Sequence, residues 1–117
     1  MDTSVWVAHF RAPLPEMVAL LNTEEVVVHP VVLGELAVGN LHERAQTLAF
    51  LKQLLDVPEW PPSAVLDFVE QHHLFGLGLS WGDVQLLAAG SLNNMPLWTF
   101  DTQLQNTATR LRLAWVK

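Results

Sequence analysis

The pattern of hydrophobic and polar positions predicts a chain built mainly of short amphipathic helices. The clearest one runs over Glu43–Leu55, where leucines at positions 48, 51, 54 and 55 fall on the same helical face. The same spacing, together with capping residues and prolines at helix starts, predicts further helices. These are Ser4–Phe10, Glu16–Leu21, Pro30–Val38, Ser63–Leu74 with Ser63 as its cap and Val65, Leu66, Val69 and Leu74 buried, Ser80–Leu92, and Thr102–Leu111.

Short apolar runs between these helices predict strands. Val26–Val28 is fully apolar and β-branched, as buried parallel strands are. Further strands are predicted at Val57–Trp60, Leu97–Phe100 and Leu113–Val116. Strands that alternate with helices are typical of an α/β domain with a parallel sheet, and neither a linker nor a repeat divides the chain. We therefore expect one domain over residues 1–117.

The start of the chain does not fit this pattern completely. In such a fold a first strand should precede Asp2, yet only Met1 stands there. We expect either that this strand is cut short before Asp2 or that the chosen start lies a few residues inside the natural one.

Composition narrows the possible functions. Half of the 117 residues are hydrophobic, and six Lys and Arg against twelve Asp and Glu give a formal charge of −6. The absence of cysteine excludes disulfide scaffolds, thiolate metal sites and thiol nucleophiles. The acidic balance disfavours adhesion to nucleic acid through a basic face, but it permits a nuclease whose carboxylates hold cations. No apolar run reaches the roughly 18 residues of a membrane helix, and no basic segment opens the chain, so we expect a soluble cytoplasmic protein.

Four carboxylates are predicted to meet at one edge of the sheet. Asp2 would follow the first strand and Asp101 follows the strand Leu97–Phe100, while Glu35 and Asp83 lie early in helices. Strand carboxyl ends and helix N-termini share the same edge in parallel α/β folds, and ligands bind there.

Each carboxylate also has a structural interpretation. Asp2 or Ser4 could cap the first helix, and Asp101 could cap the helix that begins at Thr102. Asp83 lies three residues after Ser80, which is the spacing of a capping box. Taken singly, each of these positions is better explained as a helix cap.

Glu35 is harder to explain as a structural residue. Its helical neighbours at three and four residues are all apolar or glycine: Val31, Val32, Val38 and Gly39. A carboxylate buried on such a face needs a cation or a proton. Arg11 and Arg44 could reach it only through the fold, so a metal ion is the simplest partner, with a protonated or salt-bridged Glu35 as the alternative. Oxygen ligands favour Mg²⁺ or Mn²⁺ over zinc, and the five histidines lack paired helical spacing.

Four segments of the chain resemble the motifs of PIN-domain ribonucleases, and more closely those of the VapC toxins of bacterial toxin–antitoxin pairs. These segments are Asp2-Thr3-Ser4-Val5-Trp6, Val32–Leu36, Trp81–Ala88 and Leu97–Asp101, in the order of the family and over nearly the whole chain. The resemblance implies a PIN-like three-layer sandwich in which helices flank a central parallel sheet.

The resemblance also implies an activity. Asp2, Glu35, Asp83 and Asp101 would form an acidic quartet that binds Mg²⁺ or Mn²⁺ and hydrolyses RNA phosphodiester bonds, with Ser4 and Thr99 orienting metal or water. It further implies a homodimer and a cognate antitoxin protein, with RNA as the substrate, and the hydropathy pattern adds that no membrane is expected as a partner.

Two departures from the family pattern leave an alternative open. The first strand is short, and Gly82 stands where a larger residue is more usual. The competing hypothesis is a catalytically inactive PIN-like domain that binds RNA or another protein.

Overall fold

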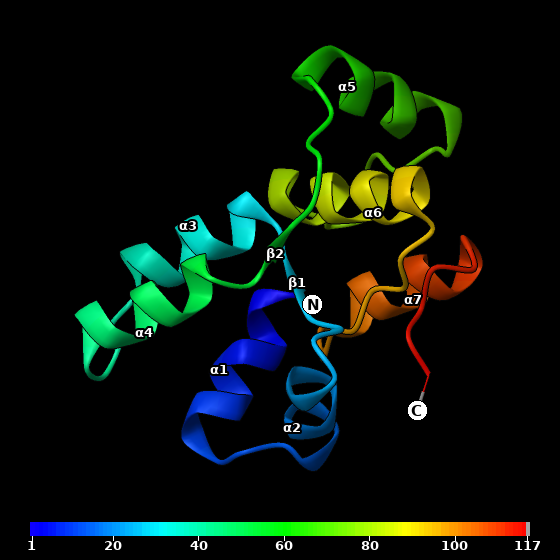
Figure 1. Cartoon of the computed structure of the whole chain (residues 1–117). Coiled ribbons are helices and arrows are strands. Elements are labelled where there is room, and N and C mark those ends of the chain that lie inside the picture. Colours follow the sequence, from blue (N-terminus) through cyan, green and yellow to red (C-terminus); the bar gives the residue numbers. More distant parts are fainter. Residues whose placement is uncertain (117) are drawn as a thin grey trace.

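The computed structural model describes residues 1–116, with residues 55 and 56 described by their backbone only. Figure 1 shows short helices arranged around a small pair of strands, with the N-terminus near the centre. The helices are α1 (Thr3–Arg11), α2 (Pro15–Asn22), α3 (Pro30–Val38), α4 (Arg44–Lys52), α5 (Pro62–Gln71), α6 (Trp81–Asn93) and α7 (Thr102–Arg110), and the strands are β1 (Val27–Val28) and β2 (Leu55–Asp56).

Strand pairing is parallel wherever it occurs, but it is sparse. In β1 and β2, Val27 lies opposite Leu55 and Val28 opposite Asp56. A separate parallel bridge joins Leu97 to Ala114. The α/β character expected from the sequence is therefore present, but within residues 1–116 the two pairings do not join, and the continuous central sheet is not confirmed.

The second strand lies earlier than predicted. The expected helix Glu43–Leu55 ends at Lys52, and residues 55 and 56 pair with β1. The prediction of a strand at Val57–Trp60 was wrong, since these residues form no regular element. Pro58 has no N–H to donate to a ladder, and long-range pairing with β1 overrides the helical phase of the last leucine.

Prolines and capping residues predicted the helix starts more reliably than apolar runs predicted the strands. Pro30 occupies the first turn of α3, and the Nδ1 atom of His29 accepts a hydrogen bond from the Val31 N–H at 2.9 Å. Ser80 caps α6 as expected. Helix α5 differs, because it begins at Pro62 after Pro61 and no side chain caps it.

One hydrophobic core connects the helices. Its fully buried side chains come from α1, α2, α3, α4, α6 and α7: Val5, Trp6, Met17, Val32, Leu51, Leu87 and Leu104. Helix α5 turns Val65 and Phe68 inward, whereas Leu66, which we expected to be buried, is 55% exposed. Helices α5 and α6 lie side by side, as do α3 and α4 (Figure 1).

Helix α6 is the central helix of this arrangement. Its run from Leu86 to Gly90 is buried, which is typical of a helix enclosed by others. Its N-terminus is thereby fixed beside α3, and this contact positions Asp83 relative to Glu35. None of the helices in the described part of the chain is both long and apolar enough to span a membrane.

Two glycine substitutions test this packing. A Cβ at Gly90 would lie 2.8 Å from the Met95 carbonyl oxygen, whereas a Cβ at Gly34 would meet nothing within 4 Å. We expect Gly90→Ala to lower the free energy of unfolding by about 1–3 kcal/mol, because a backbone oxygen cannot move aside cheaply. Gly34→Ala, the matched control in α3, should raise it by about 0.5–1 kcal/mol through helix propensity. Urea unfolding measures both, and equal effects would contradict the placement of α6.

Candidate active site

Asp2 is the most constrained of the predicted acids. It is 8% exposed and directly precedes α1, but its side chain does not cap that helix. Its Oδ2 atom instead accepts hydrogen bonds from the Ser4 hydroxyl at 2.7 Å and the Thr99 hydroxyl at 2.5 Å. The capping interpretation is therefore wrong for Asp2 and also for Ser4.

The two hydroxyl groups connect the start of α1 to the segment that precedes α7. The Ser4 Oγ atom accepts from the Phe100 N–H at 3.0 Å, and the Thr99 Oγ1 atom accepts from the Asp101 N–H at 3.0 Å. Ser4 and Thr99 thus hold the Asp2 carboxylate while both accept a backbone N–H from the segment before α7. Both hydroxyls therefore orient Asp2, and their expected role in orienting metal or water stays a prediction.

Asp101 is linked to Asp2 through Thr99, and its side chain also caps helix α7. Its backbone N–H contacts Thr99, which binds Asp2, and its Oδ1 atom accepts from the Leu104 N–H at 2.9 Å. The capping interpretation is confirmed for Asp101. One oxygen of the carboxylate is used by α7, which leaves Oδ2 as the atom able to take a ligand.

Asp83 likewise takes part in a capping box. Its Oδ2 atom accepts from the Ser80 N–H at 2.9 Å, and its own N–H donates to the Ser80 Oγ atom at 3.1 Å. This reciprocal pair of bonds satisfies two of the unpaired donors at the start of α6. The structural interpretation is therefore confirmed here as well.

Glu35 differs from the expectation in one respect. It is exposed, not buried on an apolar face, and its expected apolar neighbour Val38 is itself 88% exposed. A salt bridge does not explain it either, because His42–Glu43 is the only ion pair among the described residues. Arg44 instead donates to the carbonyl oxygens of Gly39 and Ala37 at the end of α3.

The electrostatic surroundings of Glu35 connect it to the other acids. Partial desolvation raises the pKa of its carboxyl, the negative charges of Asp2 and Asp83 raise it further, and the Thr3 hydroxyl opposes the shift. The Oε1 atom lies 3.1 Å from the position that a Cβ on Gly82 would occupy. Glu35 therefore leans against the first turn of α6, and Gly82, whose small size was noted as a departure, leaves the space for its carboxylate.

Thr3 is a residue that the sequence analysis did not single out. Its Oγ1 atom is buried and makes no hydrogen bond of ordinary geometry with any described residue, although it lies in the first turn of α1 beside Asp2. Such an orphaned oxygen is rare in native proteins and calls for a partner. The only sequence signal was its place inside the motif that begins at Asp2.

The structure brings three of the four acids, Asp2, Glu35 and Asp83, within electrostatic range of one another, and it links the fourth, Asp101, to Asp2 only through a backbone bond to Thr99. Within residues 1–116, no three acidic or histidine side chains stand close enough together to share a metal ion. The donor set is entirely oxygen and negatively charged, which suits a hard divalent cation.

Comparison with known proteins places this arrangement in a family. A family model of the PIN domain matches residues 1–110. Two curated proteins named Ribonuclease VapC32, from Mycobacterium tuberculosis strains CDC 1551 / Oshkosh and ATCC 25618 / H37Rv, are each 38% identical over 106 residues, which is 90% of this chain and 86% of the relative. No solved structure gives a significant match. The chain therefore belongs to the PIN-domain family, among its VapC-type ribonucleases.

Proposed function

We propose that the protein is a metal-dependent endoribonuclease that hydrolyses RNA phosphodiester bonds and is the toxin of a toxin–antitoxin pair. The observation that carries this proposal is the buried Asp2 carboxylate, which the Ser4 and Thr99 hydroxyls hold in one orientation. The pKa of Glu35 is raised first by desolvation and then by the charges of Asp2 and Asp83, and carboxylates that repel one another gain from a shared cation. Membership in the VapC-type ribonucleases supplies the class of reaction.

Asp2, Glu35, Asp83 and Asp101 are the residues that would hold Mg²⁺ or Mn²⁺. A divalent cation bound there supplies a more acidic water and neutralises charge on the phosphate. The Asp2 Oδ2 atom already accepts two hydroxyl hydrogen bonds, so this carboxylate is held in one orientation by Ser4 and Thr99. Preorganisation of this kind lowers the cost of arranging the site during the reaction.

The two capping acids contribute in a different way. Asp83 and Asp101 each give one oxygen to a backbone N–H and keep the second oxygen for a ligand. Glu35 is exposed, so its longer side chain can adjust to a bound ion or hold a proton when none is bound. The rigid and the adjustable carboxylates together fit a site that closes around its cation.

The partners follow from the proposed activity. RNA is the substrate, a cognate antitoxin protein binds the toxin, and the active form is a homodimer that acts in the cytoplasm. The fold would be the three-layer PIN sandwich, with the parallel pairings seen here as parts of its central sheet. The presence of all four acids, and the mutual charge interaction of Asp2, Glu35 and Asp83, supports the enzyme over the alternative of a non-catalytic domain.

RNA cleavage is the first test. Purified protein with Mn²⁺ should cut a mixed cellular RNA pool into discrete fragments, and EDTA should prevent this. Asp101→Asn should reduce the rate by at least about 100-fold through lost charge at the site. Because asparagine caps helices as well as aspartate, this variant should fold normally. Equal cleavage by the variant would assign the activity to a contaminant, and no cleavage under any condition would favour the binding domain.

A second pair of variants separates the helix cap from the chemistry at Asp83. Asp83→Asn keeps an oxygen for the Ser80 N–H, so it should abolish cleavage at little cost in stability. Ser80→Ala removes the other half of the capping box, so it should cost about 1 kcal/mol and leave cleavage largely intact. Thermal unfolding and RNA cleavage are measured on both. Loss of activity in Ser80→Ala equal to that in Asp83→Asn would show that the cap, not the carboxylate, matters.

The pKa of Glu35 gives a prediction for the metal-free protein. Because the folded state raises this pKa above its ordinary value of 4.5, stability contributed by Glu35 falls as pH rises through the interval between the two values. Glu35→Gln should therefore raise the melting temperature in EDTA at pH 7, and the gain should shrink towards pH 3.5, where Glu35 is protonated in both states.

Metal should reverse which of these two proteins, the unaltered protein or Glu35→Gln, has the higher melting temperature. Millimolar Mn²⁺ should raise the melting temperature of the unaltered protein more than that of Glu35→Gln. Glu70→Gln, which changes an exposed glutamate on α5, is the matched control and should follow the unaltered protein. A lower melting temperature of Glu35→Gln at pH 7 in EDTA would contradict the repulsion on which the site is built.

A further inference from the structure

Charge is divided unevenly between two parts of the sequence. Residues 1–70 contain ten acids and three Lys and Arg, a formal charge of −7, whereas residues 71–117 contain two acids and three Lys and Arg, a formal charge of +1. The two acids of the second part are Asp83 and Asp101, both of which belong to the proposed site. Charge asymmetry of this kind indicates that a polyanion such as RNA contacts the second part of the chain.

The end of α5 and the end of α7 meet in a region without acids. The Arg110 Nη2 atom, in the last turn of α7, donates to the His72 carbonyl oxygen directly after α5 at 3.1 Å. Both helix ends lie on the same side of the molecule (Figure 1). Neither of the segments that meet here, residues 71–82 and 102–117, contains an Asp or Glu. A phosphate that approaches these helix ends is therefore not repelled by an acid of either segment.

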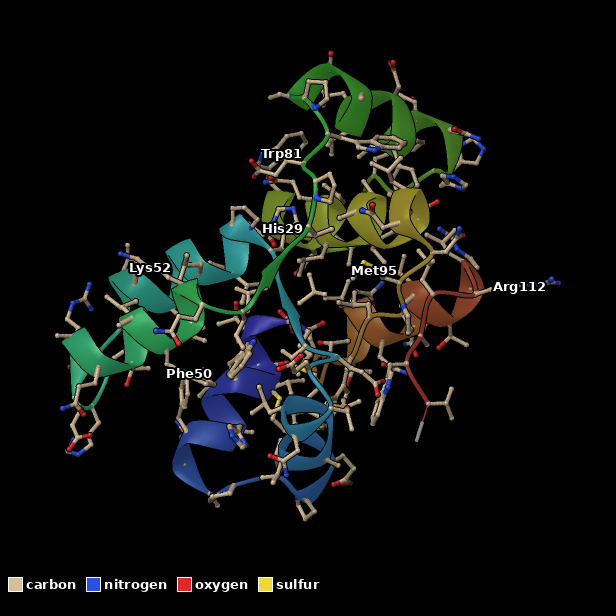
Figure 2. All side chains as sticks on the ribbon, in the orientation of Figure 1. His29, Phe50, Lys52, Trp81, Met95 and Arg112 are labelled. Carbon is tan, nitrogen blue, oxygen red and sulfur yellow. The ribbon has the colours of Figure 1, made fainter. Side chains whose placement is uncertain are left out.

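Arg112 is a cation that this region exposes to solvent. It follows α7 in a left-handed turn with a φ of 60°, and its side chain is exposed. The pair His42–Glu43 is the only ion pair between residues that the structure describes, so no acid among them neutralises Arg112. Figure 2 shows Arg112 at one end of the molecule and Lys52 of α4 at the other. An exposed and unpaired guanidinium is well suited to bind phosphate oxygens.

An exposed aromatic ring lies in the loop after α5. Phe75 is 56% exposed, and its ring meets the ring of His73 edge to face at a centroid distance of 5.9 Å. Leu74 between them is buried in the core and fastens the loop, so packing against the core does not account for Phe75. Left-handed backbone at His73 and Gly76 turns the chain on both sides of the ring. Exposed aromatic rings are platforms on which unpaired bases stack.

We propose that the side chains of His73, Phe75 and Arg112, here called the C-terminal patch, bind the phosphate backbone and one unpaired base of the RNA substrate. Arg112 contacts a phosphate, and the Phe75 ring, supported by the His73 ring, stacks on the base. The bond from Arg110 to the backbone after α5 joins the two segments that carry these side chains. That the polyanion is RNA rests on the proposed nuclease function.

The C-terminal patch lies at the far end of α7 from the acids. Asp101 caps the first turn of this helix and Arg110 ends it, and its nine residues span about 14 Å. Carboxylates without a cation repel phosphate, so they cannot hold RNA by themselves. A contact on the patch keeps the strand close to the acids whether or not a cation is bound there.

Binding of a fluorescein-labelled single-stranded RNA of mixed sequence, measured by anisotropy in EDTA, tests the cation. EDTA removes divalent metal, so the acids neither hold nor cut the RNA during the measurement. Arg112→Gln should weaken binding about 3- to 10-fold at low salt and reduce the slope of log affinity against log salt by about 0.7. Arg112→Lys, which keeps the charge, should retain most of the slope.

Lys52→Gln is the matched control for this loss of charge. It removes one exposed cation at the opposite end of the molecule (Figure 2) and should leave both the affinity and the salt slope unchanged. Equal effects of Lys52→Gln and Arg112→Gln would mean that only the net charge matters, which would overturn the patch. Absence of any RNA binding in EDTA would overturn it too.

Variants of Phe75 test the stacking contact in the same assay. Phe75→Leu keeps an apolar side chain but removes the ring, so it should weaken RNA binding about tenfold, whereas Phe75→Trp should retain the affinity. Leu66→Ala removes another exposed apolar side chain, which lies on α5 and is 55% exposed, and should bind as the unaltered protein does. Unchanged affinity in Phe75→Leu would overturn the role assigned to the ring.

An acidic protein partner would use the same cation but no stacked base. Poly-glutamate, added as a competitor at equal concentration of negative charge, should therefore displace the labelled RNA much less effectively than unlabelled RNA does. Displacement as effective as that by RNA, with no dependence on Phe75→Leu, would assign the patch to an acidic protein and overturn the proposal.

Failure of the patch and failure of the proposed function give different results. RNA binding that depends on Arg112 and Phe75, without cleavage in Mn²⁺, would keep the patch and remove the nuclease. Metal-dependent cleavage, together with RNA binding in EDTA that neither Arg112→Gln nor Phe75→Leu changes, would keep the nuclease and overturn the patch.

Discussion

The acidic site depends on the hydrogen bonds that hold the Asp2 carboxylate. This group is buried to 8% exposure, and a buried carboxylate without partners would be strongly destabilising. The hydroxyl groups of Ser4 and Thr99 provide those partners, and their own oxygens accept from the backbone of the segment before α7. The same set of bonds therefore solvates Asp2 and joins two ends of the chain. Loss of either hydroxyl would disturb the position of the acid and the contact between segments together.

The other acids show how a site can be built from groups that also stabilise the fold. Asp83 and Asp101 each satisfy a backbone donor at a helix start, so folding positions them before any ligand is present. The favourable field of a helix N-terminus helps to keep these carboxylates ionised. Glu35 has no such support, and its pKa is raised first by desolvation and then by the negative charges of Asp2 and Asp83. At Asp83 and Asp101, the bonds that stabilise the helix starts also position the carboxylates for a ligand. At Glu35, the position that suits a bound cation destabilises the metal-free fold.

Local chemistry could be predicted from the sequence, whereas long-range placement could not. The starts of α3 and α6 followed from Pro30 and Ser80, because capping bonds form within a few residues. The proximity of Asp2, Glu35 and Asp83 agrees with general rules for parallel α/β folds, whereas a shared metal site of all four acids stays a prediction. The exposure of Glu35 and the position of β2 did not follow, because each depends on which distant surface lies opposite. No pattern in the sequence predicted the unpaired hydroxyl of Thr3, apart from its position in the motif that begins at Asp2.

Few main-chain contacts join the start of the chain to the segment that carries Thr99 and Asp101. Within residues 1–116, the hydrogen bond from the Asp2 N–H to the Trp98 carbonyl is the one backbone–backbone bond between them. One such bond contributes only about 1 kcal/mol to stability. The position of Asp2 is therefore fixed mainly by its hydrogen bonds with the Ser4 and Thr99 hydroxyls. Because one of these hydroxyls comes from α1 and the other from the segment before α7, the position of Asp2 depends on side chains of both segments more than on backbone pairing.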